Sequence, residues 1–176
     1  MRSNSKLAAG VALVVALGGV AAYAQEKYSL VSPSGIKFSE FRGYEDWAVV
    51  SSARTDEVQK VIVGDPTMIK AFKAGVPAKG QLFPDGSRIV KLQWKFKKSA
   101  EAQFPVDVPD TFTQAFVMEK DSKRFPKSGG WGYAVFNYDP ASGKYTADAS
   151  SASDCGFACH TVVKAKDYIF HPYETR

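Results

Sequence analysis

The sequence predicts a mainly β (α+β) fold, an antiparallel β-sheet domain with a few short helices. One observation is the strict alternation in residues 89–97, which places Leu92, Trp94 and Phe96 on one face and polar residues on the other. A second observation is the pair of turn sequences at 84–86 and 139–143, each next to a strand-like run. Short runs joined by such turns are typical of antiparallel sheets.

The first half of the chain predicts two strands and a helix. Residues 41–53 begin with aromatic side chains and run into a β-branched strand, and residues 59–63 form a second short strand. Asp65 can then cap a helix whose first position is Pro66, a residue with no N–H group to leave unpaired. Gly75 ends this helix.

The second half predicts three further strands, over residues 89–97, 112–118 and 131–138. Alternation along the middle one places four side chains on a single face, namely Phe112, Gln114, Phe116 and Met118. The composition of residues 160–167 is helical, and we expect a short C-terminal helix there.

The N-terminus has the pattern of a secretory signal peptide. Arg2 and Lys6 precede an uncharged apolar run that ends in small residues at Ala24. A membrane anchor is the alternative, but this run is shorter than the ~20 residues that span a bilayer. We therefore expect a signal peptide at residues 1–24, a single domain at residues 25–176, a periplasmic location, and no membrane attachment after cleavage.

The charge of the chain argues against a nucleic-acid-binding surface. The formal net charge is +5 and becomes +3 when Arg2 and Lys6 are removed with the signal peptide. A nucleic-acid site needs a concentrated basic face. The basic residues here are scattered, except for a group near Lys97 that we expect on a solvated strand edge.

Cys155 and Cys159 are the two cysteines of the chain, and His160 directly follows the second. Two thiols beside one imidazole suit a covalently attached c-type haem, in which the sulfurs form thioethers and His160 binds the iron. The usual spacing has two residues between the cysteines, and here there are three. Gly156 could permit the resulting bulge because glycine tolerates unusual backbone dihedral angles.

Three other interpretations of this motif stay open on the motif alone. The cysteines could form a disulfide in an oxidising compartment. They could contribute to a zinc site, although His171 is the one other histidine. They could be a redox-active thiol pair, although no thioredoxin-like βαβ pattern surrounds them.

The segment from Cys155 to Phe170 resembles the C-terminal end of the cytochrome P-460 family and its relatives, the cytochromes c′-beta. Upstream motifs also resemble that family, in the order Phe83 to Ser87, Met118 to Asp121 and Gly129 to Gly132. The resemblance covers roughly residues 40–176. It implies an antiparallel β fold with a haem c bound near the C-terminus, and an iron whose distal side is open to nitric oxide or hydroxylamine.

In the P-460 proteins a lysine side chain is also bonded to the haem ring, and Lys91 is the candidate here. Lys91 follows the turn at 84–86 and lies on the strand face opposite Leu92 and Trp94. The alternative is a solvent-facing strand lysine like Lys95.

We assign the distal pocket to Phe112, Gln114 and Phe116, an apolar lid with one amide. Core packing is the alternative for both phenylalanines. Hydroxylamine oxidation needs a proton acceptor, and this stretch contains no acid, so the catalytic residues are unknown. The acids that flank it are Asp107, Asp110 and Glu119.

Met118 and His171 are candidates for a sixth iron ligand, which would favour electron transfer. Met118 could instead pack in the core, and His171 could instead lie at the surface.

The sequence therefore predicts an exported mono-haem c-type cytochrome that binds small nitrogen-oxide ligands at an open haem iron. A hydroxylamine-oxidising enzyme and a simple electron carrier are the alternatives. The expected partners are those ligands and a periplasmic electron-transfer protein, and a homodimer is compatible with the resemblance.

Overall fold

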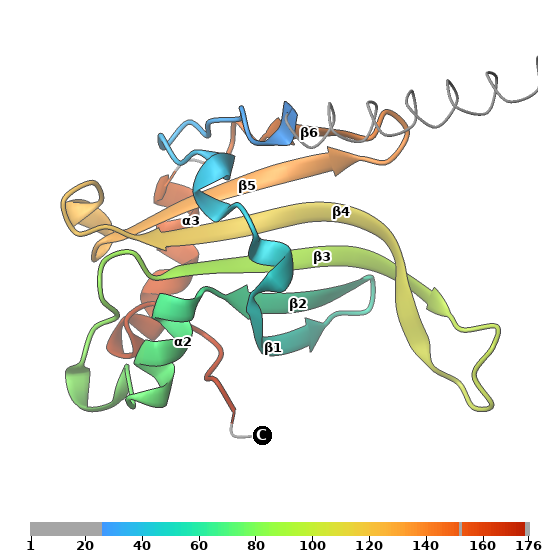
Figure 1. Ribbon diagram of the computed structural model, residues 1–176, viewed down its shortest axis with the longest axis horizontal. Coiled ribbons are helices and arrows are strands. Elements are labelled where there is room, and N and C mark those ends of the chain that lie inside the picture. The colour runs from blue at the N-terminus through green and yellow to red at the C-terminus, as the bar shows by residue number, and fades with distance from the viewer. Residues whose placement is uncertain (1–25, 152, 175–176) are drawn as a thin grey trace, which may run out of the picture.

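The computed structural model describes residues 26–151 and 153–174, without the side chains at positions 79 and 153–155. The expected signal peptide, residues 1–24, and the side chain of Cys155 lie outside the described residues. Within them, one antiparallel sheet has six strands, and strands that are consecutive in the chain are neighbours in the sheet (Figure 1). The strands are β1 (Ala48–Arg54), β2 (Val58–Gly64), β3 (Arg88–Lys98), β4 (Asp107–Lys120), β5 (Trp131–Asp139) and β6 (Lys144–Ala147).

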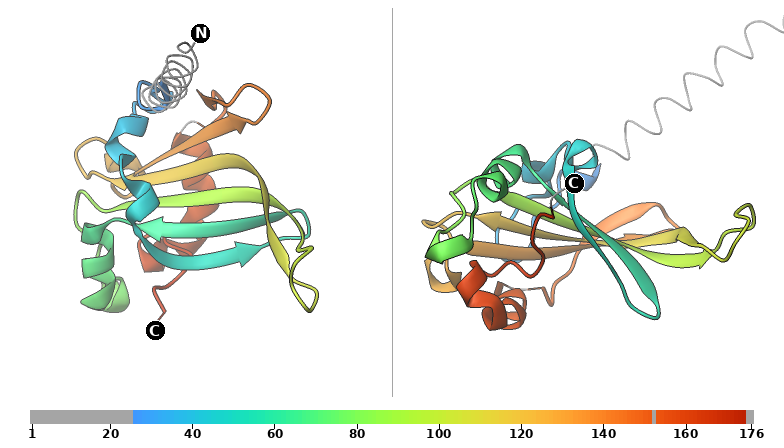
Figure 2. Two further views of the ribbon diagram at one scale, coloured as in Figure 1. Left: turned by 45° about the vertical axis from the view of Figure 1, so that its right-hand side comes forward. Right: turned by 90° about the horizontal axis from the view of Figure 1, so that it is seen from below.

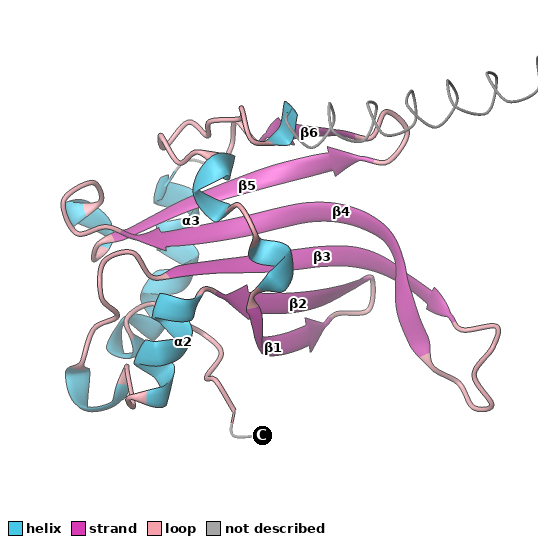
Figure 3. Ribbon diagram, viewed as in Figure 1, coloured by secondary structure: helices cyan, strands magenta, loops and turns pink. Residues whose placement is uncertain are grey.

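Helices are short and few in the described chain (Figure 3). The α-helices are α2 (Pro66–Lys73) and α3 (Ser153–His160), and 3-10 helices occupy Phe38–Phe41, Tyr44–Asp46, Ala78–Gly80, Pro126–Ser128 and Thr161–Lys166. None of the described helices is long and apolar enough to cross a membrane. The predicted mainly β fold, an antiparallel sheet with a few short helices, is therefore confirmed.

Different parts of the chain cover the two faces of the sheet. The N-terminal face, covered by residues 26–47, buries a core of Ile36, Phe38, Phe41, Tyr44, Val63, Val90, Ala115, Val117, Phe125, Ala134 and Phe136. The opposite face, here called the helix face, carries α3 (Figure 2). Ile89, Met118 and Tyr133 belong to the core on that side, which extends to α2 at the end of the sheet.

The first α-helix begins as predicted. The Asp65 carboxylate accepts hydrogen bonds from the backbone N–H groups of Met68 (2.8 Å) and Arg88 (3.2 Å), and Pro66 occupies the first turn. One side chain thus caps α2 and joins it to the start of β3. This contact fixes the beginning of β3, three residues before Lys91.

A register shift between β3 and β4 corrects one prediction. Gln93 pairs with Gln114 but Trp94 pairs with Phe112, so Thr113 is an extra residue and the strand bulges there. Phe112 consequently turns to the N-terminal face, where its ring lies 5.6 Å from that of Tyr138. The expectation that Phe112 shares a face with Gln114 and Phe116 is therefore wrong.

The C-terminal helical segment begins earlier than predicted. The short helix expected over residues 160–167 is present as a 3-10 helix over Thr161–Lys166, and α3, which ends at His160, precedes it. Asp167 then adopts a left-handed conformation, with φ of 47°, and ends the helical segment. His160 thus lies at the junction of two helical turns.

Candidate functional site

A cavity of about 370 Å³ lies between α3 and the helix face of the sheet. Its volume falls within the range of small-molecule and cofactor sites, roughly 300–1,000 Å³. Apolar side chains dominate its lining, including Ile62, Ile89, Phe116, Met118, Tyr133 and Ile169. A few polar residues from distant parts of the chain also line it: Lys91, Ser151, Cys159, His160 and His171. An apolar cavity with few convergent polar groups is typical of a site for a mostly apolar small molecule or cofactor.

His160 is held in a defined orientation. Its Nδ1 atom lies 2.6 Å from the backbone carbonyl oxygen of Tyr168, and because a carbonyl can only accept, Nδ1 donates. The ring packs against Tyr133 and Phe170, with centroids 5.1 and 4.8 Å away. Burial lowers the pKa of His160, against the effect of the Tyr168 hydrogen bond. This direction favours the neutral imidazole, which keeps the lone pair on Nε2 available to a metal.

The cysteines lie on the same helix as His160. Cys159 lines the cavity and is exposed, while Cys155 lies four residues earlier in α3, about one turn away. Positions four apart in a helix share one face, so an ordinary helix accommodates the three-residue spacing. The expectation of a bulge at Gly156 is not met, because Gly156 lies within α3 and is not left-handed.

Gly156 instead permits a close approach between α3 and β5. A Cβ atom at this position would lie 2.5 Å from the Cβ atom of Tyr133 and 2.6 Å from its ring. Such distances are shorter than any van der Waals contact. Because glycine has no side chain, α3 can approach β5 this closely, and this distance sets the width of the cavity.

Lys91 extends from β3 into the cavity. Its Nζ atom lies 3.9 Å from the centroid of the Phe116 ring, and the described residues give it no carboxylate or other hydrogen-bond partner. Burial, then repulsion from Lys60, lowers the pKa of Lys91 to about 8, although Cys159 acts in the opposite direction. Lys97, in contrast, is exposed and pairs with Asp110 at 3.1 Å. Lys91 therefore lies in the same cavity as Cys159 and His160, unlike the solvent-facing Lys97.

The three residues assigned to the distal pocket separate in space. Phe116 lines the cavity, whereas Phe112 lies on the N-terminal face because of the bulge. Gln114 stays on the helix face but outside the cavity lining. Its amide accepts a hydrogen bond from Gln93 (2.9 Å) and donates one to Asn137 (2.7 Å).

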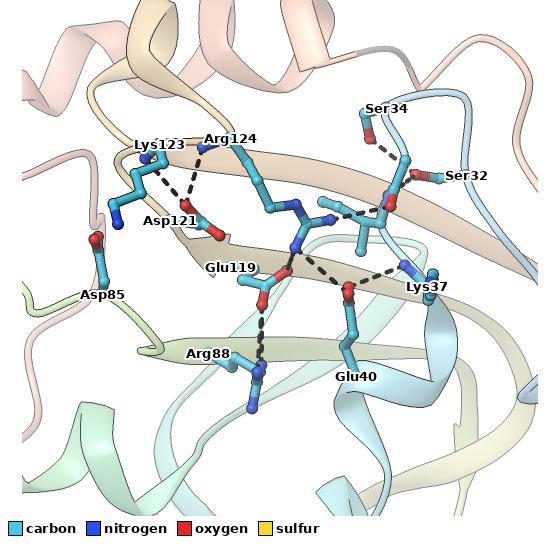
Figure 4. Close-up of polar contacts among 12 residues, drawn as sticks. Ser32, Ser34, Lys37, Glu40, Asp85, Arg88, Glu119, Asp121, Lys123 and Arg124 are labelled. Carbon is cyan, nitrogen blue, oxygen red and sulfur yellow. Dashed lines mark hydrogen bonds and ion pairs between the residues drawn. The ribbon is translucent and has the colours of Figure 1, made fainter.

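The three flanking acids are engaged elsewhere. Asp107 pairs with Arg54 (2.9 Å) and Lys98 (2.7 Å), and Asp110 pairs with Lys97. Figure 4 shows Glu119 pointing between Arg88 and Arg124, at 3.3 and 2.8 Å. No described residue that lines the cavity carries a carboxylate. The described lining therefore lacks an acidic proton acceptor.

Met118 and His171 both line the cavity. Met118 is also part of the buried core, and His171, expected at the surface, is half-buried. Across residues 26–151 and 153–174, no group of three or more His, Cys, Asp and Glu residues could hold a metal ion. The zinc interpretation thus gains no set of ligands from the described side chains.

Sequence reasoning missed the aromatic surroundings of His160. Tyr133 and Phe170 carry no motif, and the carbonyl of Tyr168 is a backbone group that any residue would provide. Alternation in residues 131–138 puts Tyr133 on the same strand face as Val135, and both residues line the cavity. That alternation was the signal that could have identified it.

Comparison with known families adds the deciding observation. The model of the Cytochrome P460 family matches residues 41–171, which include the cavity, Lys91, Cys159 and His160. The chain belongs to this family. It is therefore a c-type haem cytochrome, and the apolar cavity, the oriented imidazole and the adjacent thiol fit a haem. A search of curated proteins found no match.

Proposed function

We propose that this cytochrome is an exported mono-haem protein that binds small nitrogen-oxide ligands, such as nitric oxide and hydroxylamine, at an open iron position. Cys155 and Cys159 would hold the haem through thioether bonds, and His160 would bind the iron through Nε2. The bound haem supplies a redox-active iron with one position left for a ligand. The observation that carries the proposal is the oriented imidazole of His160 in an apolar cavity whose described lining contains no carboxylate.

The other residues of the cavity would control which ligands enter it. Phe116, Ile89 and Ile62 provide an apolar wall that disfavours water and accepts a small neutral molecule. Nitric oxide needs no proton acceptor to bind, so this wall suits ligand capture better than proton-coupled oxidation. Binding without turnover is therefore the favoured function.

A second function, hydroxylamine oxidation with a bond between Lys91 and the haem ring, is supported by the placement of Lys91. Its pKa of about 8 leaves about a tenth of the amine neutral at pH 7, far more than for an ordinary lysine, and a neutral amine is the nucleophilic form. Lys91 lies within the same cavity as Cys159 and His160. A third function, electron transfer, would need Met118 or His171 as a sixth iron ligand.

Absorption spectroscopy of the purified holoprotein separates these functions. An ordinary high-spin haem c spectrum that shifts on addition of nitric oxide supports ligand binding. A Soret band moved far to the red on reduction supports the lysine bond, and conversion of hydroxylamine would then support the enzyme. A low-spin spectrum with a methionine charge-transfer band in the absence of added ligand would refute the open iron and support an electron carrier.

Haem retention tests the attachment through sulfur. The double variant Cys155→Ala, Cys159→Ala should lose its haem on acid-acetone extraction. If it retains haem, the triple variant that adds Lys91→Met shows whether the remaining bond is to Lys91. A mass spectrum of the exported wild-type protein that shows the bare polypeptide, two hydrogens light, would indicate a disulfide and contradict haem attachment.

The export of the protein is part of the proposal. A chain that begins at Gln25 in the periplasmic fraction would support the signal peptide at residues 1–24, and a membrane-bound full-length chain would contradict it. A periplasmic electron-transfer partner and a homodimer are compatible with this location.

A further inference from the structure

The backbone carbonyl that holds His160 belongs to a turn with an unfavourable conformation. Asp167 and Tyr168 are consecutive residues with positive φ angles, 47° and 65°. Aspartate tolerates this left-handed region better than most residues, but a bulky side chain such as that of Tyr168 disfavours it. The turn that brings the Tyr168 carbonyl oxygen to 2.6 Å from Nδ1 of His160 therefore needs other contacts to hold it.

A buried ion pair provides those contacts. The Asp167 carboxylate accepts hydrogen bonds from Nζ of Lys120 at 2.8 and 2.9 Å, and from the backbone N–H of Phe83 at 2.8 Å. The side chains of Asp167 and Lys120 are only 1% and 4% exposed. Lys120 also donates to the carbonyl oxygen of Gly129 at 2.8 Å. The turn is thus joined to the end of β4 and to the segments before β3 and β5.

Gly129 connects the same ion pair to Tyr168. A Cβ atom at Gly129 would overlap the ring of Tyr168, so the glycine leaves the space that this ring occupies. The Gly129 carbonyl meanwhile accepts from Lys120. One segment therefore fixes both the ion pair and the residue whose carbonyl binds His160.

We propose that Lys120 and Asp167 are positioning residues for His160, which they orient through the backbone of Tyr168. The inference rests on the proposed role of His160 as iron ligand. Replacing a buried ion pair by apolar residues is often neutral or stabilising, so stability alone does not account for this pair. The second hydrogen bond of a metal-bound imidazole, in contrast, sets its orientation and its basicity. Neither residue lines the cavity, so both act from outside it.

The variant Asp167→Asn tests the inference in the holoprotein. Without the charge, the turn should relax and the hydrogen bond from Nδ1 to the Tyr168 carbonyl should weaken. The imidazole would then be a weaker electron donor. The iron–histidine stretching band of the reduced protein, measured by resonance Raman spectroscopy, should move to lower frequency and broaden, and the reduction potential should rise.

The matched control is Glu119→Gln. Glu119 precedes Lys120 in β4 and also forms ion pairs, but with Arg88 and Arg124 near Glu40 on the N-terminal face (Figure 4). Its loss should lower stability without moving the iron–histidine band or the potential. A shift of equal size in this control would overturn the inference, because it would show a general effect of losing an ion pair.

A second variant covers the case in which Asp167→Asn does not fold. The double variant Lys120→Met, Asp167→Asn leaves no unpaired charge, and the same shifts are expected. A folded single or double variant with the band and potential of the wild type would overturn the inference. The proposed function fails separately, if the wild type shows no iron–histidine band or if His160→Ala leaves that band unchanged.

Discussion

At the scale of single residues, Lys91 makes the cavity sensitive to pH. Burial, with repulsion from Lys60, lowers its pKa to about 8, below the usual 10.5. Below pH 8 the cavity therefore contains an ammonium group, and above pH 8 a neutral amine. Lys91 is the one lysine, arginine or carboxylate among the described lining residues. A charge in apolar surroundings acts strongly on a nearby ion.

Anion binding should therefore depend on the protonation of Lys91. The affinity of the oxidised holoprotein for azide should fall about tenfold as pH rises through 8, since a loss of about 1.4 kcal/mol in attraction corresponds to that factor. Lys91→Met should show the weaker affinity at every pH. Optical titration with azide from pH 6 to pH 10 measures both curves.

Lys97→Met is the matched control, because Lys97 is exposed and pairs with Asp110 outside the cavity. It should keep the wild-type curve. An identical fall in Lys91→Met would show that another group causes the pH dependence. A flat wild-type curve would mean that the amine does not titrate, as expected if Lys91 is bonded to the haem ring.

Some residues of the site could be predicted because a local pattern fixes them. The motif identified His160, and strand alternation placed Lys91 opposite Leu92. The acceptor of the His160 hydrogen bond could not be predicted, because it is a backbone carbonyl whose position depends on the distant contact between Asp167 and Lys120. Phe112 was misplaced because one extra residue in a strand reverses the alternation beyond it.

At the scale of elements, the contact between α3 and β5 determines the width of the cavity. Five of the six strands were predicted, from β-branched runs, alternation and turn residues, because these patterns extend over several residues. The full length of α3 was not predicted. Its sequence contains Ser153 and Gly156, which are weak helix formers, and its position depends on packing against Tyr133. Propensity is a weak guide where tertiary contacts decide.

Gly156→Ala should destabilise the protein, although alanine is the better helix former. At an unhindered helix position this change stabilises by about 1 kcal/mol. Here the new Cβ atom would lie 2.5 Å from the Cβ atom of Tyr133, and overpacking of this kind costs roughly 1–3 kcal/mol. The midpoint of urea unfolding should decrease. Ala158→Ser, at an exposed position in α3, should leave it nearly unchanged. A higher midpoint for Gly156→Ala would contradict this account of the helix–sheet contact.

At the scale of the whole molecule, one face of the sheet carries the functional cavity and the other carries a hydrophobic core. The helix face carries the cavity, and the N-terminal face carries a core that includes no cysteine or histidine among its described members. The family match begins at residue 41, yet Ile36 and Phe38 before it are completely buried in this core. The strands that hold Lys91 and Phe116 in place are therefore supported from behind by residues outside the matched region.

Phe38→Ala should accordingly weaken the haem site from the opposite face. The Phe38 ring is fully buried and stacks on Phe136 with centroids 4.4 Å apart, and such a truncation costs about 3–5 kcal/mol. A small domain has roughly 5–15 kcal/mol of stability in total. Tryptophan fluorescence and Soret absorbance should both show one urea transition, and both transitions should move to a lower urea concentration, because a single sheet connects the faces.

Phe104→Ala is the control, since that ring is 71% exposed and its loss should change stability by less than about 0.5 kcal/mol. A Soret transition that stayed in place while the fluorescence transition moved would show that the cavity does not depend on the N-terminal face.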